Sequence, residues 1–561
     1  MKIYTYVLLL LLTSVTGCRR SDVIELSTKN QVTIGALDVM ITINPLLTAD
    51  ASSIAIHDEV WQSLNQLDPK TCQLMPVLAS LPEISEDQCT YSYVMNGRAR
   101  WSDNTFVKTE DVIFTFKSII NQTAHADEYR EIFQDLDSVW SPQPSVIMFQ
   151  YNKIKINRAF DIAEILILPK HTFDSSGITD LVTWTELHAS KTSDAVSQAG
   201  EIFYGTEKSN DLKRFVGSGP YVFDEWEHGQ IVKLHKNPNY WAQNIPGLEA
   251  YPERLIYYKI ADDNARVVAL KSQNVDLISV SSKDYLHAFD SVKYSYIKKD
   301  TIYDVNYSSI MWNNSSPLFN SKRIRKALTM LFNRDAMIKI IYDGLAKKVE
   351  GPVSDLQPGW DPSLHQPEYN PLAAKKILEE EGWADSDGDG ILDKLINGQR
   401  IPFKFTFLAT SKLPLLLMVI EELRKVGIEA NLTVLDFAVV LENIRERKYD
   451  AYRAIISGSP SEPDLFEQYC SEGLKAQSNR YCYSNPVADS IMKMIKIEVN
   501  RDRRLTLIKK LQQIIVDDQP ETYLFSTPKR FAWLDRFNNV LSTRYRIDPR
   551  YFIVRNSYQS Q

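Results

Sequence analysis

The sequence predicts an α/β protein of several domains, in which helices flank mixed β-sheets. Its length of 561 residues corresponds to roughly three or four domains and allows large apolar cores. Between residues 403 and 456, segments that alternate apolar and polar side chains at period 2 take turns with segments whose apolar residues recur at helical spacing. This order is typical of a mixed, largely parallel sheet covered by helices.

The N-terminal part of the chain predicts both strands and helices. A strand and a loop follow residue 32, and His57 to Leu67 carries apolar side chains at helical spacing. Cys89 to Val94 alternates as a strand. A turn at 99–104 leads into a helix that ends near Ile120, and Thr109 is the nearest hydroxyl able to cap it.

Residues 214–241 predict a β-hairpin with a glycine-rich entry. The Gly217-Ser218-Gly219-Pro220 cluster breaks regular structure, and a half-buried strand then begins at Tyr221. His228-Gly229 forms a turn, and the returning strand ends in a second turn before Tyr240-Trp241. A phosphate-binding loop is the alternative, but no Lys-Ser/Thr follows the glycines and Pro220 opens a strand rather than a helix.

The C-terminal half continues the exchange of strands and helices. Asn370-Pro371 places a capping residue before a proline at the first helical position, and Asn500 caps another helix. The further strands are expected at 255–260, 275–278, 308–313, 403–407, 430–434, 450–456 and 522–525, and the further helices at 264–272, 324–332, 413–425 and 437–445.

Charge and motif content exclude several functions. The 64 basic and 71 acidic residues are evenly scattered, whereas nucleic-acid binding needs a concentrated basic face, so no nucleic acid is expected as a partner. The eight histidines show no ligand spacing, and no H-E-x-x-H or G-x-S-x-G motif occurs. We therefore expect neither catalysis nor a cofactor; a dispersed Ser/His/Asp triad is the alternative that one sequence leaves open.

The N-terminus predicts export and lipid anchoring. Lys2 precedes an apolar segment, Val7 to Leu12, that is too short to span a bilayer. Val15-Thr16-Gly17-Cys18 is similar to a bacterial lipobox, in which the cysteine is acylated and becomes the first residue. We expect a signal peptide at 1–17, acyl chains on Cys18, and a tether at 18–31 that faces the periplasm or cell surface. An ordinary signal peptide with a chance cysteine is the alternative, and the membrane that holds the anchor stays open.

Four further cysteines predict two disulfides. An even number of cysteines in an exported chain favours oxidation, and sequence proximity favours the pairs Cys72–Cys89 and Cys470–Cys482. The second pair would close a short loop, worth roughly 3 kcal/mol in the chain-entropy model. Zinc is the alternative, but neither pair has C-x-x-C spacing.

An aspartate-rich segment follows one predicted helix. Asp385, Asp387, Asp389 and Asp393 occupy positions 1, 3, 5 and 9 of an EF-hand-like loop, but Ile396 stands at position 12, where a bidentate glutamate is needed. We interpret the segment as a helix-to-strand turn and expect no metal; a weak calcium site is the alternative.

Three segments resemble signatures of family 5 of the extracellular solute-binding proteins, the oligopeptide- and dipeptide-binding components of bacterial ABC importers. The hairpin at 214–241 resembles the family pattern G-T-G-P-Y … G-Q … N-P-x-Y-W, with Ser218 where threonine is common. Residues 101–116 resemble W-S-D-G-x-x-x-T-A-E-D-V, with Asn104 where glycine is usual. Residues 308–344 resemble a third signature, although its D-R pair is reversed.

The resemblance runs from about residue 33 to 554 and implies a two-lobed periplasmic-binding-protein clamshell, type II-like, with three domains. Crossing segments near Tyr303–Val305 and Phe525–Ser526 would form the hinge. The implied division is a core domain of lobe 1 at 32–56, 166–303 and 526–561, an extra domain of lobe 1 at 57–165, and lobe 2 at 304–525.

The resemblance also implies a ligand site with one substitution in it. In peptide-binding relatives, an aspartate after the strand that ends at Ile456 pairs with the free α-amine of the peptide; here Ser459 replaces it, beside Gly458. A hydroxyl cannot supply that charge-assisted hydrogen bond, worth about 1.5–3 kcal/mol. Either another acid serves, Asp50 or Glu462, or the ligand lacks a free amine. We expect unblocked peptides to bind weakly and Ser459→Asp to raise their affinity.

Other positions implied to contact the ligand are less specific. Arg453 resembles a position where relatives hold the ligand's carboxylate, and Arg445 is a second candidate. Phe437 and Ile456 stand where relatives have tryptophans that line side-chain pockets, and Asn44 lies in the first cleft loop. A salt-bridged strand residue is the alternative for Arg453, and core packing is the alternative for Phe437 and Ile456.

The sequence therefore predicts a monomeric, membrane-anchored lipoprotein that performs no chemistry. It would capture an oligopeptide or peptide-like ligand between two lobes and deliver it to an ABC permease in the inner membrane. The alternative is a non-transport lipoprotein that uses the same fold as a sensor or adaptor for a partner protein.

Overall fold

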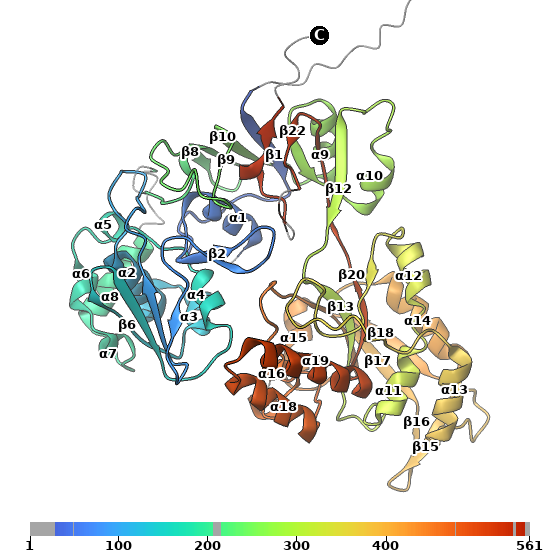
Figure 1. The fold of residues 1–561 in the computed structure, drawn as a ribbon. Helices are drawn as coiled ribbons and strands as arrows, with labels where there is room; N and C mark the ends of the chain where they lie inside the picture. The colour runs from blue at the N-terminus through green and yellow to red at the C-terminus, as the bar shows by residue number, and fades with distance from the viewer. Residues whose placement is uncertain are drawn as a thin grey trace, which may run out of the picture.

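The computed structural model describes residues 29–48, 50–205, 212, 215–476, 478–541, 543 and 546–555. The predicted signal peptide, Cys18 and most of the predicted tether lie outside these residues. The chain forms two lobes, one built from the N-terminal half with the C-terminal end and one built from residues after about 307 (Figure 1). Within the described ranges, no helix has both the length and the apolar character needed to cross a bilayer.

A seven-stranded sheet forms the centre of the first lobe. Its strand β1 is buried in the middle and pairs in parallel with β10 and β11, while β8, β9 and β10 form antiparallel pairs. The sheet order is β12-β21-β11-β1-β10-β9-β8, with bounds β1 Gln31–Ala36, β8 Tyr221–Glu227, β9 Ile231–Lys236, β10 Arg254–Lys259, β11 Leu277–Ser279, β12 Ile297–Ile302 and β21 Lys529–Leu534. Helices α1 (Ala51–Val60), α9 (Asp263–Lys271) and α10 (Ser282–His287) and the pairs β2 (Asn65–Leu67)–β3 (Leu74–Pro76) and β22 (Phe537–Asn538)–β23 (Ile553–Val554) complete it.

A second, four-stranded antiparallel sheet belongs to the same lobe. Its order is β4-β5-β7-β6, with bounds β4 Glu83–Ile84, β5 Thr90–Val94, β6 Leu136–Gln143 and β7 Val146–Tyr151. Helix α2 packs on this sheet and also contacts α5 to α8. The helices are α2 Thr109–Ile120, α3 Asp127–Ile132, α4 Arg158–Ala163, α5 Lys170–Phe173, α6 Ile178–Leu181, α7 Trp184–Leu187 and α8 Asp194–Gly205. One apolar core runs through both sheets of this lobe.

The second lobe surrounds a six-stranded sheet in the order β14-β20-β13-β19-β17-β18. Its strands are β13 Tyr307–Trp312, β14 Lys347–Lys348, β17 Lys404–Ala409, β18 Glu429–Val434, β19 Ala451–Ile456 and β20 Glu521–Ser526, with a separate hairpin β15 Asp393–Ile396 and β16 Gln399–Pro402. Its helices are α11 Lys322–Thr329, α12 Arg334–Ile341, α13 Pro371–Glu380, α14 Pro414–Lys425, α15 Phe437–Arg445, α16 Phe466–Tyr469, α17 Gly473–Ala476, α18 Pro486–Ile497 and α19 Arg501–Asp518.

The expectation of parallel strands holds for the three strands between residues 403 and 456, but the sheet of the lobe as a whole is mixed and not largely parallel. Only β17 pairs in parallel, with β18 and β19, whereas β13 pairs antiparallel with β19 and β20, and β14 pairs antiparallel with β20. Strand β13 enters the sheet from the first lobe and strand β20 leads back to that lobe, so the local strand–helix pattern does not determine their direction.

The chain passes between the lobes at two adjacent places. Residues 303–306 join β12 to β13, and residues 527–528 join β20 to β21. Lys529 Nζ lies 2.7 Å from the Asp304 carboxylate, so an ion pair links the two passages. This paired connection is the arrangement expected of a clamshell hinge.

Neither predicted disulfide is formed in the described part of the chain, so this prediction is wrong. Cys72 lies just before β3 and Cys89 just before β5, in different sheets. In the second pair, the thiol of Cys470 contacts the Asp489 carboxylate, while the thiol of Cys482 contacts the Ser315 hydroxyl. Burial raises the pKa of both thiols, and each is held by a different polar neighbour.

Candidate functional site

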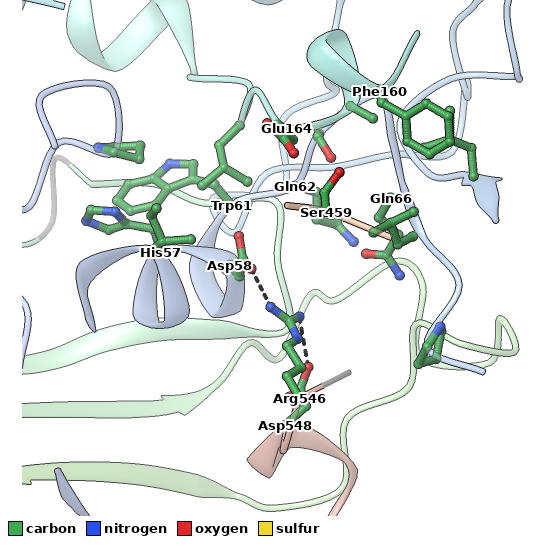
Figure 2. Close-up of a pocket in the computed structure, with 18 of the residues that line it drawn as sticks. His57, Asp58, Trp61, Gln62, Gln66, Phe160, Glu164, Ser459, Arg546 and Asp548 are labelled. Atoms are coloured by element: carbon green, nitrogen blue, oxygen red, sulfur yellow. Dashed lines mark hydrogen bonds and ion pairs between the residues drawn. The ribbon is translucent and has the colours of Figure 1, made fainter. Parts of the chain in front are cut away.

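A cavity of about 420 Å³ lies where the second lobe reaches the first (Figure 2). Its wall comes mainly from α1 and the residues after it, from α3 and α4, and from the C-terminal segment; Ser459 is contributed by the second lobe. The lining residues are Pro45, Ile54, His57, Asp58, Trp61, Gln62, Ser63, Gln66, Leu67, Pro69, Leu74, Tyr129, Ile132, Phe160, Ala163, Glu164, Leu166, Ser459, Thr543, Arg546, Asp548, Arg550 and Tyr551.

Helix α1 supplies one wall, and the glycine-rich segment fixes where it ends. The backbone N–H of Gly219 donates to the Val60 carbonyl over 2.8 Å. A Cβ at Gly217 would lie 2.0 Å from the same oxygen, so the two backbones approach closely only because glycine is present. Trp61 takes an extended conformation, and its indole N–H donates to the Val216 carbonyl over 3.1 Å. The helix predicted through Leu67 therefore stops at Val60.

The two aromatic residues at the end of the hairpin segment hold a cavity side chain. The indole N–H of Trp241 donates to Gln62 Oε1 over 3.0 Å, and the Gln62 amide N–H donates to the Tyr240 hydroxyl over 3.2 Å. Tyr240 in turn donates to the Leu248 carbonyl over 2.9 Å. The Gln62 side chain is thereby fixed at the cavity wall.

A charge network from the C-terminal segment closes another side of the cavity. Arg546 bridges Asp58 at 2.7 Å and Asp548 at 3.0 Å (Figure 2). Arg550 lies 3.0 Å from Asp548 and 3.3 Å from Glu59. Burial raises the pKa of Glu59 well above its usual value although Arg550 opposes it, whereas for Asp548 the two arginines outweigh burial and lower the pKa. These charges are compensated within the protein.

Two further titratable groups line the cavity. His57 is fully buried, and burial lowers its pKa to about 4, so its ring is neutral at pH 7 and bonds the Thr42 carbonyl over 2.9 Å. Glu164 directly follows α4, and its side chain is exposed to the cavity. The atoms packed around the Glu164 carboxyl group desolvate it and raise its pKa to about 7, and the nearby charge of Asp161 adds to the effect.

A smaller cavity of about 140 Å³ adjoins Ser459; the second lobe provides most of its lining, and Asn157 of the first lobe also lines it. It is lined by Ile456, Gly458, Ser459 and Glu462, which follow one another at the end of β19. The Ser459 hydroxyl shares a 2.6 Å hydrogen bond with that of Ser461.

Comparison with known proteins shows the family to which this chain belongs. Residues 73–475 match the model described as bacterial extracellular solute-binding proteins, family 5 Middle. The chain belongs to this family. It is accordingly a solute-binding protein of the ABC-transporter class, not an enzyme, and the resemblance of the three signature segments is confirmed.

Individual relatives agree with this assignment. The oligopeptide-binding protein AppA of Bacillus subtilis is 27% identical over 501 residues, which cover 88% of this chain and 85% of the relative. A probable D,D-dipeptide-binding periplasmic protein of Escherichia coli, DdpA, is 23% identical and is covered to 90% on both sides. Among solved structures, AppA in complex with a nonapeptide superposes with a TM-score of 0.66 at 24% identity, covering 95% of this chain and all of that one. HbpA2 of Haemophilus parasuis gives 0.77 at 17% identity, covering 94% and 100%. The two-lobed fold is confirmed.

The structure places the two acids that the sequence offered in place of an aspartate at position 459. Asp50 caps α1, accepting hydrogen bonds from the backbone N–H groups of Ser52 and Ser53 at 3.1 and 2.9 Å. Glu462 is buried and pairs with Arg501 at 2.8 Å and Arg504 at 2.7 Å. Both carboxylates of this solute-binding protein are therefore engaged in structural contacts.

The other predicted positions lie apart from the larger cavity. Arg453 is partly buried on β19 beside the Tyr342 hydroxyl, and burial lowers its pKa. Phe437, at the start of α15, is 61% exposed, and Arg445, at its end, is also exposed. Asn44 is buried and its side-chain oxygen accepts from the Leu46 backbone, which fixes the loop that carries cavity residue Pro45.

Several cavity residues were not predicted as a site. Trp61 was assigned to the apolar face of a helix, and Gln62, Glu164 and Arg546 were not singled out. Tyr240 and Trp241 of the hairpin signature bond Gln62, but they are far from it in sequence, so only the fold reveals this contact. No local sequence signal marks Glu164, because its place in the cavity depends on how α4 packs.

The aspartate-rich segment forms an exposed turn next to β15. Asp385 accepts from the backbone N–H groups of Gly388 and Gly390 at 2.8 and 3.1 Å. Asp393 accepts from the Ser386 hydroxyl and does not share in the grouping of carboxylates, whereas Asp385, Asp387 and Asp389 place one oxygen each within 4.8 Å of the others.

Proposed function

We propose that this protein captures an oligopeptide or peptide-like solute in the cavity between its lobes and delivers it to an ABC permease. The observation that carries the proposal is the composition of the cavity wall, in which Ser459 of the second lobe completes a surface otherwise made by the first. A site shared by both lobes couples ligand binding to closure. The AppA relative, solved with a nonapeptide, supports the ligand class.

The wall has the chemistry that a peptide needs. Its volume of about 420 Å³ falls in the ordinary range for ligand pockets, roughly 300–1,000 Å³. Trp61 and Phe160 offer apolar surface for side chains. The amides of Gln62 and Gln66 can both donate to and accept from a peptide backbone.

The second lobe adds a smaller subsite next to the cavity. We propose that Ser459 and Gly458 contact the ligand backbone and that Ile456 contacts one side chain, since all three line the 140 Å³ cavity at the end of β19. For Arg453, Arg445 and Phe437 a ligand role would require closure of the lobes, because they do not line the larger cavity.

We also propose that the protein is exported and anchored as a monomer through acyl chains on Cys18, with residues 18–31 as a tether. The support is the Val15-Thr16-Gly17-Cys18 sequence. Cys18→Ser should move the protein from the membrane fraction to the soluble fraction, whereas Cys89→Ser, a matched thiol change outside the lipobox, should leave it on the membrane. Membrane retention of Cys18→Ser would contradict the anchor.

A thermal-shift screen tests the proposed ligand class. The purified protein is heated with synthetic peptides of two to nine residues and with muropeptides. Ligands that bind only the folded state add about 2.7 kcal/mol of stability at 100 times Kd, so a binder raises the melting temperature. Stabilisation by peptides supports peptide capture. Absence of stabilisation by every peptide would contradict it and would favour an adaptor role.

A further inference from the structure

The ionisable groups that line the larger cavity differ in whether the protein itself provides them with a partner. Asp58, Asp548, Arg546 and Arg550 take part in ion pairs with one another or with Glu59. His57, also in the wall, is neutral and bonded to a backbone carbonyl. Among the cavity groups in the described part of the chain, Glu164 alone has a carboxylate with neither an ion pair nor a hydrogen bond.

The position of Glu164 is electrostatically unfavourable in the absence of a cation. It caps the C-terminal end of α4, where the helix dipole disfavours negative charge. Burial, and after it the carboxylates of Asp161 and Asp58, raise the pKa of Glu164, whereas Lys155 opposes this rise. The Tyr129 hydroxyl also lies near the carboxylate. Lys155 Nζ lies 2.8 Å from the Asp161 carboxylate and forms its ion pair there, so it offsets the charge of Glu164 only in part.

The rest of the wall suits a positive charge near this carboxylate. Four side chains with a phenyl, phenol or indole ring line the same cavity, Trp61, Tyr129, Phe160 and Tyr551, and aromatic faces attract ammonium groups. Figure 2 shows Glu164 on the wall that also contains Gln62 and Ser459. Among the described residues of the second lobe, Ser459 alone lines the cavity, so none of them brings an acid to it, and Glu462 is paired with two arginines.

We propose that Glu164 binds a positively charged ammonium group of the solute, either a free α-amine or the side chain of a basic residue. The proposal rests on the proposed function of the cavity. The ammonium site would then lie at the end of α4 in the first lobe and not in the loop after β19, where the family resemblance places it. A free amine is then bound despite the serine at position 459, which revises the expectation drawn from the sequence.

The test compares Glu164→Gln with the unaltered protein by titration calorimetry. The probes are three versions of one peptide that stabilises the protein in the screen: with a free N-terminus and no basic residue, N-acetylated, and N-acetylated with one lysine. Glu201→Gln, an exposed glutamate on α8, is the matched control, and Glu164→Asp retains the charge.

We expect Glu164→Gln to weaken binding of the ammonium-bearing probes by about 10- to 100-fold, the loss of one charge-assisted hydrogen bond, and to leave the uncharged acetylated probe unchanged. Loss confined to the free N-terminus identifies an α-amine site, and loss confined to the lysine probe identifies a side-chain site. Glu164→Asp should retain part of the preference, and Glu201→Gln all of it.

Two results would overturn the inference in distinguishable ways. If the Gln variant binds all three probes as tightly as the unaltered protein, peptide capture stands and the role of Glu164 is refuted. If no peptide binds the unaltered protein, the proposed function fails and this inference fails with it.

Discussion

At the scale of single residues, the protonation state of Glu164 determines whether the cavity can bind an ammonium group. Its pKa is raised to about 7 in the unliganded protein, and the charged and titratable groups that face it are Asp161, Asp58, Lys155 and Tyr129. Only the ionised carboxylate pairs with an ammonium, so a bound cation should lower this pKa.

This gives a pH prediction with a definite sign. Affinity for the lysine probe, whose ammonium stays charged over this range, should be greatest above pH 7 and should fall as the pH drops below it, by up to about tenfold per pH unit, because Glu164 must then release a proton to bind. The free α-amine should show the same fall below pH 7 and a second loss of affinity above about pH 8, where it is itself deprotonated. Calorimetry between pH 5 and pH 8 measures this. The acetylated probe without lysine should show no such dependence on pH, and neither should any probe with the Glu164→Gln variant. A pH dependence that persists in that variant would assign the effect to another group.

A glycine contact gives a second prediction at this scale. Gly217→Ala should lower the free energy of unfolding by about 1–3 kcal/mol, the usual cost of overpacking, because the new Cβ would lie 2.0 Å from the Val60 carbonyl. Urea denaturation measures the loss. Gly97→Ala is the matched control, since nothing lies within 4 Å of a Cβ there. Equal stability of the two variants would contradict the close approach.

At the scale of elements, the N-cap of α1 allows a test of whether Asp50 has a structural role or binds the ligand. Asp50→Ala should lower the free energy of unfolding by about 0.5–2 kcal/mol through loss of the N-cap and should leave peptide affinity unchanged, because the carboxylate bonds Ser52 and Ser53. Asp50→Ser should restore most of the stability. Calorimetry that finds a tenfold loss of affinity in a fully stable Asp50→Ala protein would instead make Asp50 a ligand contact.

Elements with strong local periodicity were predictable. The helix Phe437–Arg445 forms over the predicted residues, and the hairpin around His228-Gly229 has its turn where the glycine requires it, with Gly229 at φ +62°. Elements decided by distant contacts were not: α1 ends at Val60 because the Gly217–Gly219 backbone binds there, which no local pattern reveals.

The candidate site was less predictable than the fold. The sequence located the loop of Gly458 and Ser459, which does reach a cavity. It could not show that the carboxylates of Asp50 and Glu462 already have partners. The partner of Asp50 depends on the capping geometry of a helix, and the partners of Glu462 depend on tertiary packing. It gave no sign of Glu164, whose neighbours Asp58 and Ser459 are far from it in sequence.

At the scale of the whole molecule, the described residues join the lobes near the cavity through a small number of contacts, and one of these is apolar, since Ile156 of the first lobe packs against a core of the second. The Asn157 amide donates to the Glu462 carbonyl over 2.6 Å, and the Gln88 amide donates to the Ile497 carbonyl over 3.4 Å. The two chain passages at 303–306 and 527–528 connect the sheets. Because these contacts are few, ligand binding in the shared cavity can change the angle between the lobes at modest cost.

Small-angle X-ray scattering of the purified protein, with and without a stabilising peptide, measures whether the lobes close on the ligand. If the lobes close over a solute held between them, the radius of gyration should fall on addition of the peptide and should not fall with a peptide that gives no thermal shift. A peptide that binds in stoichiometric amount while the radius of gyration stays unchanged would contradict capture by closure.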